Sequence, residues 1–147
     1  MTLAMSWDEW AAHDGVGLAD RVRRGELTPA ELARQAAAAI AKTNPAVSAV
    51  VEVFDDVVED PLRDGLDPQG PFAGLPFLMK DLGPTLKGRL QEQGSIFMRG
   101  NRPQADIYLT SRMRRAGLNL MGRTTTPEFG VCSSAENPAV YVTRNPW

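Results

Sequence analysis

The chain has 147 residues, of which 43% are hydrophobic and 23% charged, and its formal net charge is −2. These proportions are typical of a globular domain and not of a disordered segment. The slightly acidic balance argues against a surface that binds the phosphates of nucleic acids. A single cysteine excludes an internal disulfide, and a single histidine argues against a histidine-based metal cluster or a Ser-His-Asp triad.

The beginning of the chain lacks the pattern of a secretory signal, because no basic segment precedes a long apolar one. No stretch reaches the ~18 apolar residues that a membrane span needs. We therefore expect a cytoplasmic protein that binds neither membranes nor nucleic acid.

The first part of the chain is predicted to be helical. Ser6 can cap a short first helix, and Gly25 is expected to end a second one. Thr28–Glu31 forms a capping box with proline at the first helical position, which predicts a helix over residues 29–42. Asn44-Pro45 is expected to stop that helix.

The middle of the chain alternates short apolar runs with loops. Residues 47–54 are rich in valine and predict a buried strand, and residues 75–79 predict a second buried strand. The acids, prolines and glycines of residues 55–70 predict a loop with at most one helical turn. Residues 83–103 show little periodicity, and a loop of this length inside a compact domain is usually functional.

Regular elements are expected again near the C-terminus. Asp106 is predicted to cap a helix that Gly117 ends, and residues 118–122 predict another short buried strand. Pro127 is expected to begin a single helical turn, and the remaining residues are predicted to form polar loop. Strand, helix and strand in this order predict an α/β fold with a layered core.

A lysine ends the second apolar run, inside a stretch rich in glycine and proline over residues 70–82. Burying an ammonium group without a partner is costly, so a lysine at the edge of a core is rarely there for packing alone. Lys80 is therefore the candidate catalytic residue, and the alternative is a structural lysine paired with Asp81 or with another nearby acid. Asp81 itself, on the opposite face of the strand, is expected to anchor a loop.

Five short segments follow one another along the sequence in a characteristic order. In this order they resemble the amidase signature family of amide hydrolases, and the resemblance extends over nearly the whole chain. The segments are Pro71–Asp81, Gln93–Ser95, Asp106–Gly117, Gly122–Gly130 and Thr143–Trp147.

In that family a lysine at the position of Lys80 belongs to a Ser–cis-Ser–Lys triad that needs no metal or other cofactor. The resemblance implies that Lys80 accepts a proton through one serine, while a second serine attacks the carbonyl carbon of a small-molecule amide. Glycine-rich backbone N–H groups would hold the oxyanion. Burial lowers the pKa of lysines in general, and the apolar run before Lys80 is expected to supply such surroundings.

The family carries both triad serines in a Gly/Ser-rich segment that follows its Asn-Pro-Trp motif, and the present sequence ends at Trp147. The resemblance thus implies the N-terminal part of the amidase signature fold, with a mixed sheet core flanked by helices, incomplete in this chain. Residues 1–147 would be a fragment of one domain, helical over 1–45 and α/β over 46–147. Such a chain is expected to be inactive alone and to self-associate through unpaired strand edges.

Two other interpretations stay open. The chain could be similar in role to the A subunit of a tRNA-dependent amidotransferase, which would imply partner chains, or it could be a non-catalytic remnant. Arg123 and Tyr141 replace the family's usual lysine and glycine, which leaves the subgroup and the substrate open. Residues 70–82 look most like the group that contains 6-aminohexanoate-cyclic-dimer hydrolase. A homodimer is expected for an intact enzyme.

The remaining candidates have structural explanations. Cys132 has no histidine nearby in the sequence and is expected to be a buried or half-buried thiol. Trp7 and Trp10 are expected to pack the N-terminal helices together. A solvated helix face is expected, rather than a site for an anionic ligand, for the arginines at positions 99, 102, 112, 114, 115 and 123.

Overall fold

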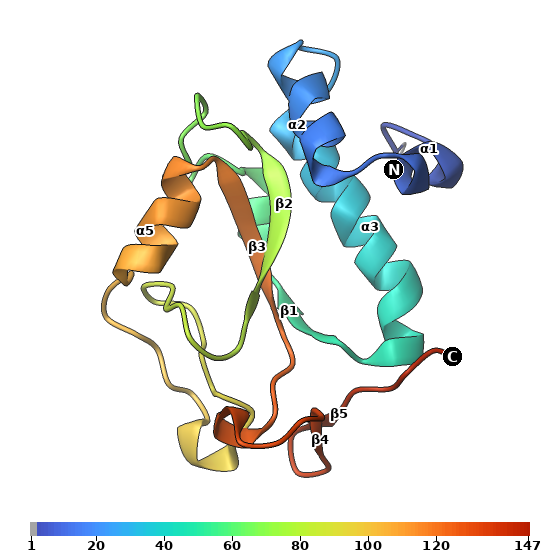
Figure 1. Cartoon of the computed structure of the whole chain (residues 1–147). Helices are drawn as coiled ribbons and strands as arrows, with labels where there is room; N and C mark the ends of the chain where they lie inside the picture. The colour runs from blue at the N-terminus through green and yellow to red at the C-terminus, as the bar shows by residue number, and fades with distance from the viewer. Residues whose placement is uncertain (1–2) are drawn as a thin grey trace.

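A mixed three-stranded sheet lies at the centre of the computed structural model, which describes residues 3–147 (Figure 1). Strand β3 is in the middle, antiparallel to β1 and parallel to β2, and helices α3 and α5 lie on opposite sides of the sheet. This arrangement confirms the predicted α/β fold. The elements are α1 (Trp7–Ala12), α2 (Gly15–Arg23), α3 (Pro29–Val47), β1 (Val50–Val53), α4 (Asp55–Glu59), β2 (Leu75–Lys80), η1 (Ile96–Met98), α5 (Tyr108–Arg115), β3 (Leu118–Thr124), η2 (Glu128–Gly130), β4 (Glu136–Asn137) and β5 (Tyr141–Val142).

The start of α1, the end of α2 and the start of α3 lie where the sequence predicts, and the structure adds a cap for the start of α2. Ser6 caps α1 in a reciprocal capping box with Glu9, and Asp14 caps α2 through the N–H of Gly17. Gly25 follows α2 with a φ of 73°, a left-handed conformation that glycine adopts without a steric penalty. Helix α3 starts with the predicted capping box.

The predicted end of α3 at residue 42 is wrong, because the helix continues through Pro45 to Val47. Pro45 lies in the last turn, where its missing N–H removes a single helical hydrogen bond. The Asn44 side chain supports this end, since its Oδ1 accepts the N–H groups of Ala49 and Val50 and its Nδ2 donates to the Val50 carbonyl. Ser48, with a φ of 51°, then turns the chain into β1.

The strands differ in length and burial from the predictions. Strand β1 is shorter than residues 47–54 and only half-buried, because it lies at an edge of the sheet. Strands β2 and β3 are longer than predicted by one and two residues. The interior of β3 is buried throughout, as its central position requires.

Two predictions near the C-terminus are wrong. Asp106 does not cap α5, which begins after Ile107 without a side-chain cap. The Asp106 carboxylate instead accepts hydrogen bonds from the Lys87 N–H and from Arg114 Nε, which join the preceding loop to the helix. The predicted polar loop at the end of the chain contains the small hairpin of β4 and β5. The predicted helical turn after Pro127 is present as η2.

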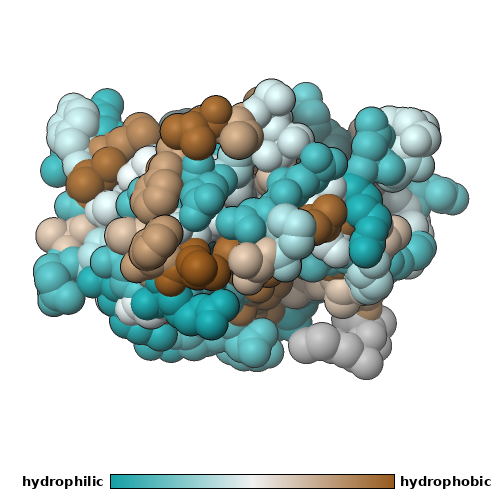
Figure 2. Space-filling view, turned by 90° about the horizontal axis from the view of Figure 1, so that it is seen from below, coloured by the Kyte–Doolittle hydropathy of each residue, from teal (hydrophilic) through white to brown (hydrophobic). Residues whose placement is uncertain are grey.

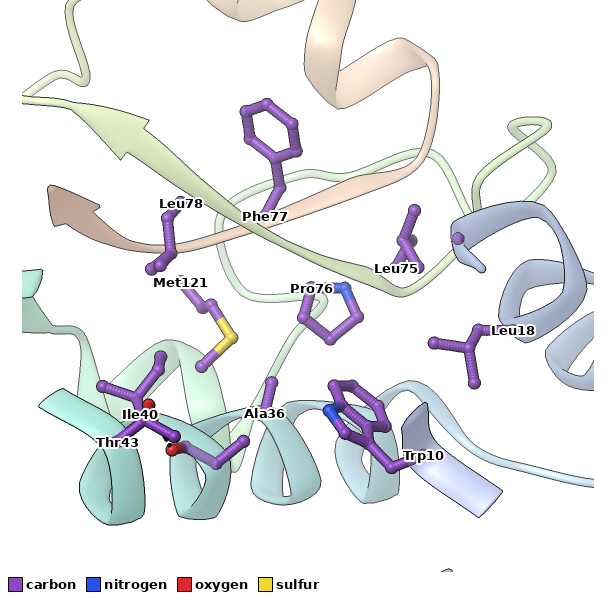
Figure 3. A pocket seen from close by; sticks show the side chains of 12 residues that line it. Trp10, Leu18, Ala36, Ile40, Thr43, Leu75, Pro76, Phe77, Leu78 and Met121 are labelled. Atoms are coloured by element: carbon purple, nitrogen blue, oxygen red, sulfur yellow. Dashed lines mark hydrogen bonds between the residues drawn. The ribbon is translucent and has the colours of Figure 1, made fainter. Parts of the chain in front are cut away.

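The core lies mainly between α3 and the sheet, and apolar side chains along one face of α3 form one side of it. A cavity of about 360 Å³ remains between α3 and β2 (Figure 3). Pro76 and Met121 point into this gap, whereas Phe77 points to the other face of the sheet. Trp10 contacts both hydrophobic clusters and so packs the N-terminal helices as predicted. Among the described residues, no helix combines the length and the apolar character needed to cross a membrane.

Candidate active site at the carboxyl ends of two parallel strands

The candidate lysine lies where two parallel strands end side by side. Lys80 is the last residue of β2 and pairs in register with Thr124, the last residue of β3. Both strands run toward the end of the molecule that carries η1 and η2 (Figure 1). Ligands of open α/β sheets bind beyond the carboxyl ends of the strands, so this end is the candidate site.

The Lys80 side chain is exposed, although a position at the edge of the core was expected. Strand alternation explains the difference, because Met79 and Asp81 on either side are both buried and Lys80 faces the other way. Within residues 3–147, the Lys80 ammonium has no carboxylate partner and no hydrogen-bond acceptor. The alternative of a structural pair between Lys80 and Asp81 is therefore wrong for this structure.

Asp81 anchors a loop, as predicted. Its side chain is 1% exposed, and its Oδ1 accepts hydrogen bonds from Arg123 Nη1 at 2.9 Å and from the Glu92 N–H at 2.8 Å. Its Oδ2 accepts the Gly94 N–H at 3.3 Å. Both carboxylate oxygens are thus occupied, and the loop after β2 is attached to the end of that strand.

Arg123 is the residue that sequence reasoning placed wrongly. It is 5% exposed rather than part of a solvated basic face, and its guanidinium holds three carboxylates. Its Nε, Nη1 and Nη2 each lie 2.9 Å from an oxygen of Glu52, Asp81 and Glu92 respectively. The missed signal is the position of an arginine directly after the apolar run of residues 118–122, because the strand continues through it and a buried arginine requires anionic partners.

The turn over residues 92–95 connects the surrounding loops. Gln93 and Gly94 are both left-handed, with φ of 53° and 64°. The Gln93 carbonyl accepts the Phe129 N–H, and the Gly94 carbonyl accepts Asn137 Nδ2. A Cβ on Gly94 would lie 2.5 Å from the Thr126 carbonyl oxygen, so the turn is packed too closely for any side chain there. The long loop that lacks periodicity is therefore ordered by tertiary contacts.

Tyr141 closes the other side of this turn. Its hydroxyl accepts the Thr126 N–H at 2.7 Å and donates to the Thr126 carbonyl at 2.8 Å. Burial raises the pKa of the Tyr141 hydroxyl, which therefore remains a donor near neutral pH. The departure from the family pattern at this position thus supplies a specific pair of hydrogen bonds.

Three nucleophilic side chains of the C-terminal half have other partners or lie at the surface. Ser95 is 2% exposed, and its Oγ donates to Glu128 at 2.7 Å. Ser134 bonds to Glu136 at the surface. Cys132 is exposed, contrary to the prediction of a buried or half-buried thiol, because it lies in the irregular segment between η2 and β4.

Exposed apolar side chains gather at this end of the molecule. Figure 2, which views the structure from that end, shows several hydrophobic patches between hydrophilic areas. Phe97 in η1 is 84% exposed and Val131 after η2 is 80% exposed. The end of the molecule toward which β2 and β3 run therefore carries exposed apolar side chains.

Comparison with known proteins gives a consistent family assignment. A family model described as Amidase matches residues 31–147. The 6-aminohexanoate-cyclic-dimer hydrolase of Paenarthrobacter ureafaciens is 37% identical over 142 residues, which cover 95% of this chain and 28% of that protein. The A subunit of the glutamyl-tRNA(Gln) amidotransferase of Symbiobacterium thermophilum is 37% identical over 130 residues, covering 84% of this chain and 26% of that protein.

The solved structures agree. A structure of 6-aminohexanoate cyclic dimer hydrolase matches with a TM-score of 0.81 at 36% identity, covering 92% of this chain and 28% of that one. The chain thus spans little more than a quarter of the length of these relatives. Since the family model covers most of the chain, the chain belongs to the amidase signature family and corresponds to an N-terminal portion of its members.

Proposed function

We propose that Lys80 is the proton-accepting lysine of a Ser–cis-Ser–Lys triad that hydrolyses a carbon–nitrogen amide bond in a small molecule. The observation that carries the proposal is the position of Lys80. It ends a strand at the carboxyl edge of the sheet, and its amine is exposed and bound to no carboxylate within residues 3–147. Family membership supports the same role.

In this mechanism the amine of Lys80 takes a proton relayed by one serine from a second serine. The second serine oxygen bonds to the carbonyl carbon, the C–N bond breaks, and the amine leaves with a proton. Water then cleaves the acyl-serine ester and restores the enzyme. Both serines would come from the Gly/Ser-rich segment of the family, so we propose that the 147-residue chain is inactive alone.

Three further properties remain predictions: a cytoplasmic location, a homodimer, and the division of the chain into residues 1–45 and 46–147.

The first test assays the 147-residue chain against 6-aminohexanoate cyclic dimer and a linear aryl amide. No turnover above background is expected for this chain. Reading the DNA beyond codon 147 shows whether a longer form carries the Gly/Ser-rich segment. In such a form Lys80→Ala should lower kcat by about 100-fold or more, whereas Lys87→Ala, the matched control, should retain activity. Turnover by the short chain that is lost in Lys80→Ala would contradict the proposed inactivity, and a longer form unaffected by Lys80→Ala would contradict the triad.

A second candidate is a role like that of an amidotransferase A subunit. It is favoured by the 37% identity to the Symbiobacterium thermophilum protein, which equals the identity to the cyclic-dimer hydrolase. An amidotransferase role would make activity depend on partner chains and on a tRNA-linked acceptor. Amide hydrolysis by a purified longer form without any partner chain would count against this candidate.

A further inference from the structure

Asp81 is a buried carboxylate at the end of β2 and therefore needs a counter-ion. It is 1% exposed, and a buried carboxylate without a counter-ion is strongly unfavourable. The cation nearest in sequence is Lys80, the preceding residue. A pair between these two residues would satisfy Asp81, but it would also bind the amine that the proposed function needs.

The counter-ion of Asp81 comes from a neighbouring strand, β3. Arg123 is in register with Met79, and its Nη1 lies 2.9 Å from Asp81 Oδ1. The N–H groups of Glu92 and Gly94 occupy the rest of the Asp81 carboxylate. Asp81 therefore has a counter-ion and three hydrogen-bond donors without any contribution from Lys80.

The other partners of Arg123 keep its guanidinium in this place. Glu52 on β1 binds Nε, and Glu92 in the loop after β2 binds Nη2. The second oxygen of Glu92 accepts the Gly100 N–H at 2.8 Å, which fixes that carboxylate from the other side. A guanidinium presents five donors in one plane, so it can bond three carboxylates at once in a fixed geometry, which the single ammonium of a lysine cannot reproduce.

We infer that Arg123 is a positioning residue that keeps the amine of Lys80 free by taking its neighbouring carboxylate. Its use in catalysis rests on the proposed function, but the state of the amine is a property of this chain alone. Without Arg123, Asp81, Glu52 and Glu92 lose their shared counter-ion. Asp81 is the one of these carboxylates next to Lys80 in the chain, and its unpaired charge attracts the Lys80 ammonium, although the two side chains face opposite sides of β2. A carboxylate next to an amine favours the charged, unreactive form of that amine.

The chain is well suited to a direct measurement of this effect, because Lys42, Lys80 and Lys87 are its only lysines. Trace acetylation with acetic anhydride modifies neutral amines, and mass spectrometry of peptides gives the rate at each lysine. Lys42 and Lys87 serve as internal references. The 147-residue chain is compared with Arg123→Gln, with Asp81→Asn and with the double variant at about pH 8.

In Arg123→Gln, the acetylation rate of Lys80 relative to Lys87 should fall by about threefold or more. The double variant should return the rate to the level of the unchanged chain, because the carboxylate that captures Lys80 is gone. Rescue by a second substitution distinguishes this effect from general loss of structure. An unchanged rate in Arg123→Gln, or an equal loss in the double variant, would overturn the inference.

Asp81→Asn keeps the test decisive if Arg123→Gln fails to fold. Since Asp81 is already paired with Arg123 and faces away from Lys80, this variant should change the Lys80 rate by less than about twofold. A clear acceleration would show that Lys80 is paired with Asp81 and would contradict the inference. Acetylation does not measure amide hydrolysis, so a failed amidase assay leaves this result standing, and a failed acetylation test leaves the triad proposal to its own assay.

Discussion

At the scale of single residues, Gly94 has the strictest steric requirement near the candidate site. An alanine there would combine a left-handed backbone with a Cβ 2.5 Å from the Thr126 carbonyl oxygen. Gly88 has a similar φ of 74°, but a Cβ at that residue would meet no atom within 4 Å, so it is a matched control. Gly88→Ala should cost about 1 kcal/mol, and Gly94→Ala about 3 kcal/mol. Urea unfolding measures both, and equal losses would contradict the steric argument.

The charge of Glu92 makes the stability of the same region depend on pH. Burial acts to raise the pKa of this carboxyl, but the Gly100 N–H and the Arg123 guanidinium together hold it below its ordinary value of 4.5. A lowered pKa in the folded state means that the stabilisation is complete above the unfolded value and is lost as the pH falls through the folded value. Glu92→Gln should therefore cost about 1–3 kcal/mol near neutral pH, and the difference should shrink below 4.5.

The control for this pH dependence is Glu59→Gln, at the exposed end of α4. This substitution should change the free energy of unfolding by less than about 0.5 kcal/mol at any pH. The measurement is urea unfolding at a series of pH values. A difference between Glu92→Gln and the unchanged chain that stays constant down to acid unfolding would show that the Glu92 charge does not stabilise the fold.

At the scale of elements, the end of α3 depends on one side chain. Asn44 makes two hydrogen bonds through Oδ1 and one through Nδ2 to the start of β1. Asn44→Ala should destabilise the protein by about 1–3 kcal/mol. Thr43→Ala, the neighbouring control, loses only a bond to the Ala39 carbonyl and should cost less than about 0.5 kcal/mol. Equal effects in thermal unfolding would show that Asn44 does not hold this junction.

The elements also show which features the sequence could predict. The starts of α1 and α3 follow from local capping residues, and the place of Lys80 at the end of a strand follows from the apolar run before it. The prediction for Asp106 failed, because its carboxylate serves Lys87 and Arg114 rather than the start of its own helix. Lys87 lies 19 residues earlier in the chain, and such a partner leaves no local pattern in the sequence. The same reason explains why the burial of Arg123 was not predicted. Its carboxylate partners come from β1, from the residue after β2 and from a loop.

At the scale of the whole molecule, β2 is an edge strand within residues 3–147, and Phe77 on it is 37% exposed. An edge strand with apolar surface favours pairing with another chain. The isolated chain should therefore self-associate, with a light-scattering mass that rises with concentration. Phe77→Lys should reduce this association, because a charged side chain disfavours edge pairing. Phe97→Lys, away from the strand edge, is the control.

A monomer of 16.0 kDa that melts cooperatively at all concentrations would contradict this prediction. Equal effects of both lysine substitutions would assign the association to general hydrophobicity instead of the β2 edge.

The central place of β3 has a consequence for biosynthesis. Within the described part of the chain, neither β1 nor β2 pairs with any strand but β3, although both precede it by many residues. During synthesis on the ribosome, β1 and β2 therefore have no strand partner until residues 118–124 have emerged. Closing such long loops is entropically costly and makes sheet formation late and slow. Chaperone binding to nascent chains should consequently be strongest just before β3 is synthesised.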